Sequence, residues 1–421
     1  MDFLKFLDSC VTPAHTAGTL AGIFGEAGFS RLDLCSEFDL VPGGAYFAVR
    51  GSALVAFRVP ESVSAASRFR IALAHTDFPA LKVSPNPDCG KAGIKTVHPE
   101  VYGSPLFTSW LDRDLGYGGV LAFEKDGAVW TKVFRGKGLL RIPQLAVHLN
   151  RGVNQEGLKL DPQVDLNALW GESGIGDERF ADALRRELGA GERLLDFDVR
   201  LFDAQPAAVG GLDGEWIYSG RLDNLSSCHA VVESIVASKP LEKDFQVAAF
   251  FNNEEVGSET REGAAGNFLR AVLEEVACRL PLASRLSAIL AESCALSIDM
   301  AHAVHPNRPE KHEPNHAPIL GGGIVLKTNS QMRYASDVES SARLRLLCER
   351  AGVALQTFVM RNDMPCGSTV GPAVSASLGI PTVDIGEPML SMHSAREMTA
   401  KKDHESMIRL VSAFFESEAQ G

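Results

Sequence analysis

The sequence predicts an α/β protein with one helix-covered sheet and a second, β-rich domain inserted into it. Three observations support this class. Short apolar runs recur along the chain, and each ends in polar residues. Helix-like segments precede or follow several of these runs, which is typical of an α/β sheet with covered faces. Residues 86–218 differ, because they are rich in glycine and charge and contain short runs of alternating polarity.

The elements follow in order along the chain. Residues 12–27 are predicted to form a helix, with Thr12 as its N-cap and Pro13 at its first position. Strands are predicted at 69–77, 245–255, 295–302 and 380–388, and helices at 224–238 and 263–279. In the insert, "GGVLAFEKDGAVWTKVF" predicts a hairpin that turns at Asp126-Gly127. The Pro- and Gly-rich stretches "SPNPDCGKAG" and "GGLDGEW" are typical of domain edges. We therefore expect a discontinuous domain, residues 1–85 and 219–421, around an insert of residues 86–218.

Composition narrows the function classes. The 421 residues carry a formal net charge of −12 and contain no Lys/Arg run longer than two, which argues against a nucleic-acid partner. No apolar stretch reaches the length of a membrane span, and the start "MDFLKFLDSC" does not resemble a secretory signal. Eight cysteines are scattered without a C-x-x-C pair, so we expect free thiols in a reducing cytoplasm rather than a thiolate metal cage.

Two adjacent carboxylates, Glu254 and Glu255, follow an apolar run at the end of a predicted buried strand. Like charges this close repel each other unless a positive group lies beside them. A bend at the strand end would let one glutamate bind a metal ion while the other faces a reacting water. Further candidates stand at the ends of other strands or at a helix start: His75, Asp77, Asp223, Asp299 and His393.

Open α/β sheets place their ligand sites at the carboxyl ends of the strands, so these residues can converge. Imidazoles and carboxylates without a thiolate are the ligands of a hydrolytic zinc, cobalt or manganese site. Each residue also has a simpler interpretation. The His75–Asp77 segment is compatible with a strand-end turn, Asp223 with a helix N-cap, Asp299 with a loop and His393 with an ordinary polar histidine.

Seven segments, which run in one order along nearly the whole chain, resemble aspartyl aminopeptidases, a branch of the dinuclear zinc exopeptidases. They are "AHTDFPALKV", "SGRLDNLSSCHA", "FFNNEEVGSE", "SIDMAHAVHPN", "EKHEPNHAP", "RNDMPCGSTVGP" and "MLSMHSAREM". The resemblance implies a metallopeptidase domain with a central mixed sheet flanked by helices, and a dimerisation role for the insert. It also implies two divalent metal ions per subunit, zinc or else cobalt or manganese.

The resemblance assigns roles residue by residue. Asp223 would bridge the two ions, His75 and Asp299 would complete one site, and Glu255 and His393 would complete the other. Glu254 would be the general base and later the acid. Asp77 would orient the His75 ring.

Roles outside the metal ligands are also implied. His148, in "RIPQLAVHLNR", would reach the active site of the neighbouring subunit in a dodecameric shell, or it is a surface histidine on a dimer face. Lys327 would pair with an acidic first side chain of the peptide, or it is a surface lysine after a strand. His302 and His305 would line the floor of the site or be structural. The loop of Gly367, Ser368 and Thr369 would allow the backbone to approach the substrate closely.

Three positions depart from the family's pattern. Asn252 stands where an aspartate is common, Arg308 where an aromatic residue is common, and Glu387 adds a carboxylate near a metal ligand. If Glu387 faces the pocket, it opposes an acidic substrate side chain. The resemblance thus predicts an aminopeptidase acting on free N-termini, and the first residue stays open between Asp or Glu and neutral residues.

Two other functions compete with this prediction. A related dinuclear deacylase or carboxypeptidase would share the ligand pattern. A non-catalytic shell protein would be expected to lack Glu254 or a ligand, and none is missing here.

Overall fold

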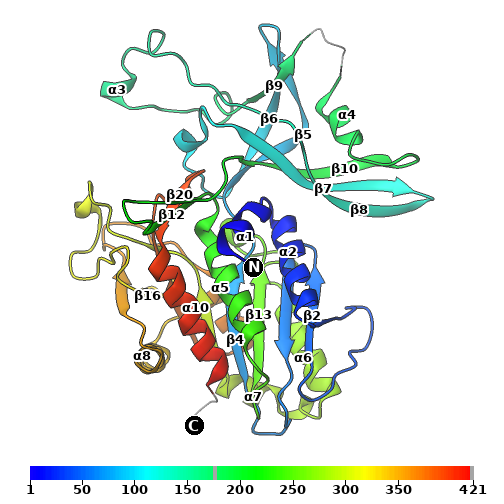
Figure 1. Ribbon diagram of the computed structural model, residues 1–421, viewed down its shortest axis with the longest axis vertical. Helices are drawn as coiled ribbons and strands as arrows, with labels where there is room; N and C mark the ends of the chain where they lie inside the picture. Colours follow the sequence, from blue (N-terminus) through cyan, green and yellow to red (C-terminus); the bar gives the residue numbers. More distant parts are fainter. Residues whose placement is uncertain (174–177, 418–421) are drawn as a thin grey trace.

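A mixed sheet forms the centre of the larger part of the molecule (Figure 1). The computed structural model describes residues 1–173 and 178–417. Within these residues the sheet has nine strands, in the order β1 (Ser30–Arg31), β2 (Ala45–Arg50), β3 (Ala53–Arg58), β13 (Phe245–Phe251), β4 (Phe69–His75), β14 (Cys294–Ile298), β18 (Thr382–Gly386), β16 (Ile324–Thr328) and β17 (Leu355–Val359). Strands β13, β4, β14 and β18 are parallel, whereas β3 and β16 run antiparallel to β13 and β18. The predicted α/β class with a central mixed sheet is confirmed.

The central strands are buried on both faces. Every residue of β4 and β13 is buried, as expected for parallel strands that form continuous apolar runs. One face packs against α1 (Phe3–Ser9), α2 (Pro13–Glu26), α5 (Leu222–Ala237), α8 (Val338–Ala351) and α10 (Lys401–Glu416). The other face packs against α6 (Phe268–Arg279), α7 (Leu286–Glu292) and α9 (Val370–Leu378).

The first residue of helix α2 agrees with the prediction, whereas that of helix α6 does not. Helix α2 starts at Pro13 with Thr12 as N-cap, as predicted, although the Thr12 hydroxyl bonds to His15 rather than to a backbone N–H. Helix α6 begins at Phe268, five residues later than predicted from 263. The delay follows from Gly263 and Gly266, whose N–H groups bond to Thr260 and Gly263 in consecutive turns.

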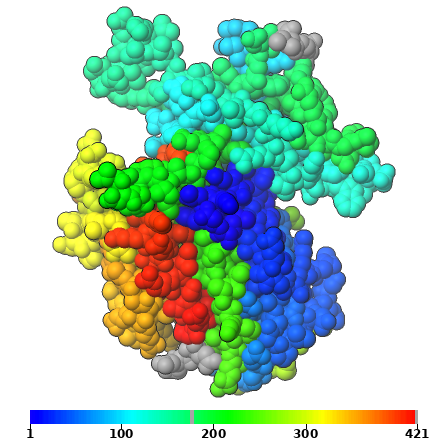
Figure 2. Space-filling model, viewed as in Figure 1, coloured from blue at the N-terminus to red at the C-terminus, as the bar shows by residue number. Residues whose placement is uncertain are grey.

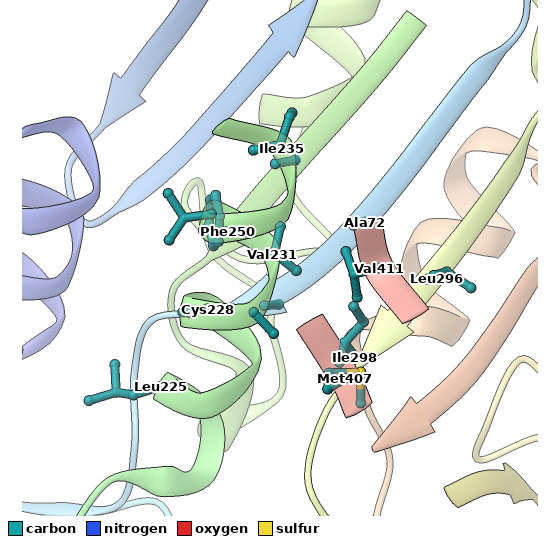
Figure 3. Packing of buried hydrophobic residues seen from close by; sticks show 14 of the residues in the cluster. Ala72, Leu225, Cys228, Val231, Ile235, Phe250, Leu296, Ile298, Met407 and Val411 are labelled. Atoms are coloured by element: carbon teal, nitrogen blue, oxygen red, sulfur yellow. The ribbon is translucent and has the colours of Figure 1, made fainter. Parts of the chain in front are cut away.

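Packing of α5 and α10 on the sheet positions the start of α5. Figure 3 shows Cys228 and Val231 of α5 and Met407 of α10 near Ala72 of β4 and Ile298 of β14. All five of these residues are 0% exposed. Each large apolar side chain buried in this way contributes about 1.5–3 kcal/mol. The first turn of α5 is therefore held beside the carboxyl ends of β4 and β14.

A second, wholly antiparallel sheet lies beyond one end of the first and forms a separate layer (Figures 1 and 2). Its order is β8 (Ala128–Arg135), β7 (Leu115–Lys125), β10 (Arg193–Asp203), β5 (Ala80–Lys91), β6 (Ile94–Tyr102) and β9 (Ala168–Glu172). Strands β7 and β8 form the predicted hairpin, with Lys125 paired to Ala128 around Asp126-Gly127. Short helices α3 (Val153–Glu156) and α4 (Phe180–Arg185) lie between strands of this sheet. Along the whole described chain, 3₁₀ turns lie at Phe107–Trp110, Glu254–Val256, Ala283–Arg285 and Pro309–Lys311.

The strands of this sheet do not begin or end at the predicted domain edges. Strand β5 starts at Ala80, inside the range 1–85, because "SPNPDCGKAG" is part of the β5–β6 hairpin rather than a linker. Pro85 and Pro87 lie where the register shifts between Val83 and Asp88, which is a position that tolerates proline in a sheet. The boundaries of an independent insert remain a prediction.

At the other edge the chain returns to the larger part before residue 218. After Asp203, the end of β10, strands β11 (Ala208–Gly210) and β12 (Trp216–Ser219) join β20 (Glu397–Ala400), β19 (Pro388–Leu390) and β15 (Ala301–His302) in a small sheet. Among the described residues, none of the helices is both long and apolar enough to cross a membrane.

Candidate metal centre

The predicted site residues come from loops at one edge of the central sheet. His75 ends β4, and Asp299 directly follows β14. After β13, Asn253 adopts φ 64° and turns the chain into the 3₁₀ turn that carries Glu254 and Glu255. Because β4, β13 and β14 are parallel, these carboxyl ends meet at the same edge.

Two residues reach this edge from other elements. Asp223 lies in the first turn of α5, in non-helical conformation, and its peptide bond to Asn224 is cis. His393 lies between β19 and β20 with φ 67°.

The five predicted ligands form two groups that share Asp223. His75 Nε2 lies 3.4 Å from Asp223 Oδ1 and 3.5 Å from Asp299 Oδ1. His393 Nε2 lies 3.5 Å from Asp223 Oδ2 and 3.4 Å from Glu255 Oε2. The two oxygens of Asp223 therefore face different imidazoles.

These spacings fit ligands of a metal ion better than hydrogen bonds. Ligand atoms bound tetrahedrally at about 2.0–2.1 Å from one ion are separated by about 3.3–3.4 Å. Hydrogen bonds would bring nitrogen and oxygen to about 2.7–3.2 Å. Asp223 Oδ1 is buried and has no hydrogen-bond partner, a costly state for a carboxylate unless a cation satisfies it. The donor set accordingly suits divalent ions.

The Asp77 carboxylate accepts hydrogen bonds from the backbone of both glutamates. It is fully buried, and its Oδ1 and Oδ2 accept the backbone N–H groups of Glu254 at 3.1 Å and Glu255 at 3.2 Å. The Tyr102 hydroxyl also donates to Oδ2, at 2.7 Å. The nearest partner of His75 Nδ1 is the main-chain oxygen of Asp77 at 3.0 Å, with the carboxylate at 3.4 Å. Both parts of Asp77 thus contact the ring that it was predicted to orient.

The Glu397 carboxylate binds the backbone of Asp223 and His393 in the same way. Its Oε2 accepts the backbone N–H of Asp223 at 3.2 Å, and its Oε1 accepts that of His393 at 2.7 Å. Sequence reasoning assigned no role to Glu397 or to Tyr102. Glu397 stands within the matching segment "MLSMHSAREM", which was the only available signal. Each buried carboxylate therefore fixes the backbone of two site residues.

Carboxylates outnumber the basic side chains in this centre, and this shifts the pKa values of its residues. Burial raises the pKa of Glu254 to about 8, and the neighbouring carboxylates act in the same direction. Burial opposes charge on His393, but Asp223 and Glu255 outweigh it and raise the pKa of His393 to about 10. The carboxylates likewise raise the pKa of His75 well above its usual value, against the effect of burial. The protonated imidazoles of His75 and His393 thus balance part of the negative charge of the carboxylates. Bound metal ions would take over this role, and both imidazoles would release their protons on binding them.

A cavity of about 590 Å³ opens onto this centre. The predicted site residues that line it are Asp223, Glu254, Glu255, Asp299, His302, Lys327, Gly367, Ser368, Thr369 and His393. An added Cβ at Gly367 would meet no atom within 4 Å, so this part of the wall is open to a substrate backbone. Burial lowers the pKa of His302 to about 4, so its ring is neutral at pH 7.

Four predicted residues do not line this cavity: His75 and Asp77 are buried within the centre, whereas His305 and His148 lie away from it. His305 was expected on the floor of the site, but it is exposed, and its Nδ1 accepts the backbone N–H of Asn307. The loop after β15 has turned away by that point, which places the ring outside. His148 is exposed in the insert and does not line the cavity of its own chain.

The departures from the family's pattern lie away from the reacting groups. Glu387 is 0% exposed and its Oε1 lies 2.9 Å from His404 Nδ1, so it does not oppose a substrate side chain. The Asn252 amide donates to Glu262 at 3.0 Å, and an aspartate there would face that carboxylate instead. Arg308 is exposed and lies 3.8 Å from Glu310.

The comparisons with known proteins agree with this geometry. A family model described as "Aminopeptidase I zinc metalloprotease (M18)" matches residues 6–415. This chain belongs to the M18 family. It is 42% identical over 422 residues to "Probable M18 family aminopeptidase 2" of Streptomyces avermitilis, a match that covers 99% of this chain and 97% of that protein. A Pseudomonas aeruginosa protein of the same name is 39% identical and covered to 97%, with 98% of this chain matched.

Solved M18 structures have the same fold. The structure described as "the Ape4 and Nbr1 complex" has a TM-score of 0.93 at 33% identity, covering 98% of this chain and 84% of that one. The S. cerevisiae mApe1 dodecamer has a TM-score of 0.84 at 27% identity, covering 98% and 95%. The chain is thus an M18 aminopeptidase, as the sequence predicted.

Proposed function

We propose that this M18 aminopeptidase removes N-terminal residues from peptides at a centre that holds two divalent ions. Asp223 would be shared by the two ions, His75 and Asp299 would be the further ligands of one, and Glu255 and His393 those of the other. The observation that carries this proposal is the placement of the two Asp223 oxygens, each 3.4–3.5 Å from a different imidazole. Zinc is the metal in the family's description, and the same donors accept cobalt and manganese.

Glu254 is the general base in this proposal. When bound, the metal ions supply an activated water and polarise the scissile carbonyl. The Glu254 side chain lines the cavity, with Oε2 4.0 Å from His75 Nε2, while its backbone N–H is held by Asp77. Burial and the neighbouring carboxylates raise its pKa to about 8, and the charge of bound divalent ions would lower that pKa again, so that Glu254 would be ionised and able to accept a proton near neutral pH. It takes the proton of the water and returns it to the leaving amine.

The proposal extends to the first residue of the peptide, Asp or Glu. Two cationic side chains, Lys327 and Arg333, line the cavity and favour a carboxylate there. A preference for neutral residues is the alternative.

It also extends to assembly in the cytoplasm, as a dodecamer built from dimers through the insert. Leu145, Val147 and Leu149, which flank His148, are 61%, 49% and 73% exposed. Apolar side chains gathered this way on a surface are typical of an interface. The mApe1 relative is described as a dodecamer, which supports assembly into twelve subunits. In such an assembly we expect His148 to reach the active site of the neighbouring subunit.

Metal counting tests the centre directly. We expect two ions per subunit in the active enzyme, and Asp223→Ala should lose both, whereas His75→Ala should lose chiefly one. Elemental analysis of the purified variants measures this. Loss of the same single ion in both variants would remove the bridging role of Asp223.

Substrates with free and acetylated N-termini test the reaction, because only the free amine should support turnover. Light scattering of Leu149→Asp tests the assembly. The variant should dissociate, and an active wild-type monomer would remove the role of His148 across the interface.

A further inference from the structure

The side chain of Tyr102 contacts the two residues that hold the backbone at Glu254. Its hydroxyl donates to Asp77 Oδ2 at 2.7 Å and accepts the side-chain amide of Asn253 at 2.9 Å. Asp77 Oδ1 accepts the backbone N–H of Glu254, and Asn253 directly precedes Glu254 in the chain. One hydroxyl, which can donate and accept at the same time, thus fixes the start of the turn that carries the proposed base.

The turn at Asn253 positions the Glu254 side chain. Asn253 adopts φ 64°, a left-handed conformation that is uncommon for residues other than glycine. Its amide is held at both ends, because Nδ2 donates to Tyr102 and Oδ1 accepts the Thr260 hydroxyl at 2.9 Å. Within residues 1–173 and 178–417, no hydrogen bond holds the Glu254 carboxylate itself, and its Oε2 lies 4.0 Å from His75 Nε2. The place of this carboxylate therefore follows from the backbone of the turn.

A buried arginine of the insert's sheet holds the Tyr102 ring. Strands β10 and β6 lie on either side of β5, and Arg200 of β10 meets Tyr102 of β6 across it. Arg200 is 5% exposed, and its guanidinium carbon lies 3.9 Å from the centre of the ring. Its Nε lies 3.6 Å from Asp198, whereas its Nη1 is buried without a hydrogen-bond partner among the described residues. A cation that is removed from water and placed over an aromatic face is attracted to it, so this stack fixes the ring.

We propose that Tyr102 is a positioning residue for the general base Glu254, and that Arg200 acts through Tyr102. Neither side chain lines the cavity, so the insert controls the reaction from its own sheet without touching the substrate. This inference rests on the proposed aminopeptidase centre and adds the residues that set the place of its base.

Tyr102→Phe removes the hydroxyl and keeps the ring. With aspartyl- or leucyl-p-nitroanilide, whichever wild type cleaves faster, kcat should fall about 10- to 100-fold, because a displacement of about 1 Å is costly in a reacting group. KM should stay within about threefold of wild type, since the lost contact does not bind substrate. Elemental analysis should find the wild-type number of metal ions, and added zinc should not restore kcat. A purely structural role would lower the melting temperature and leave kcat of the folded enzyme unchanged.

Two further variants test the role of Arg200 and provide a control. Arg200→Lys keeps the charge but loses the planar guanidinium, and kcat should fall by less than in Tyr102→Phe. In the Tyr102→Phe background the same substitution should change kcat little, because the hydroxyl that Arg200 positions is already gone. Tyr46→Phe is the matched control. The Tyr46 hydroxyl accepts the Val41 N–H at 2.9 Å and does not line the cavity, so its loss should lower the melting temperature and leave kcat as in wild type.

An unchanged kcat in Tyr102→Phe overturns the inference. A loss of kcat that added zinc restores also overturns it, because Tyr102 would then act on the metal ions rather than on the base. Additive effects of Arg200→Lys and Tyr102→Phe on kcat would remove the role of Arg200. A wild-type enzyme that cleaves neither substrate when loaded with zinc, cobalt or manganese overturns the proposed function itself.

Discussion

Replacing Glu397 with glutamine should weaken metal binding without unfolding the protein. Glu397 is 2% exposed, and its two oxygens accept the backbone N–H groups of His393 at 2.7 Å and Asp223 at 3.2 Å. Glutamine has the same shape but offers one oxygen and one NH₂ group, so a donor then faces a donor. The shorter contact favours keeping the oxygen against His393, and the loss falls on Asp223.

The magnitude follows from these contacts. A hydrogen bond to a charged acceptor contributes about 1.5–3 kcal/mol, and about 1.4 kcal/mol is tenfold in a binding constant. If the lost bond is expressed in the position of Asp223, zinc should bind about 10- to 100-fold more weakly, the range typical of losing a partner of a metal ligand. Competition with a chelator measures the affinity, and kcat at saturating zinc should recover towards the wild-type value.

Glu387→Gln is the matched control. Glu387 is 0% exposed and, like Glu397, contributes a buried carboxylate, but its hydrogen bond is to His404 and not to a proposed ligand. We expect a lower melting temperature and zinc affinity within about threefold of wild type. Equal weakening of zinc binding in both variants, or none in Glu397→Gln, would refute the reasoning.

Three further predictions concern the base, the buried lysine and acid stability. Glu254→Gln should retain its metal in elemental analysis but lose at least about 100-fold in kcat, and a tenth of wild-type activity would place the base elsewhere. Lys327→Met should reduce kcat/KM for aspartyl substrates more than for leucyl substrates, because only the former lose a partner for their charge; an equal loss for both would contradict this. Burial lowers the pKa of His15 from 6.5 to about 4. The unfolded chain therefore binds its proton first as the pH falls, and the free energy of unfolding should drop between pH 6.5 and 4 by up to about 1.4 kcal/mol per unit. Denaturant titrations should show a smaller drop in His15→Gln than in the exposed control His316→Gln.

The sequence could predict the sheet and the convergence of strand ends because both follow from local patterns. Polar residues after buried runs, such as His75 and Glu254, are placed at one edge by any parallel arrangement of those strands. The hydrogen-bond partners of Lys327 could not be predicted in this way. The three oxygens around Lys327 include main-chain groups of a neighbouring loop, and no periodicity reports them.

The residues that were missed act over long sequence distances. Tyr102 reaches Asp77 only because the β5–β6 hairpin folds back, and that hairpin was interpreted as a domain edge for its prolines and glycines. Glu397 contacts Asp223 across 174 residues of chain. His305 shows the reverse case. It is close to Asp299 in sequence, yet it does not line the cavity.

The insert and the metal centre are mechanically joined at one short segment. Where β6 leaves the insert's sheet, the Tyr102 hydroxyl donates to Asp77, which holds the two glutamates. Next along the chain, the Ser104 carbonyl lies 3.0 Å from His393 Nδ1, and the Leu106 N–H donates to the His393 carbonyl at 2.8 Å. Residues 102–106 thus support both halves of the centre. Deleting the insert would remove these supports together with any subunit contact, so point substitutions on its exposed face are the means to separate assembly from catalysis.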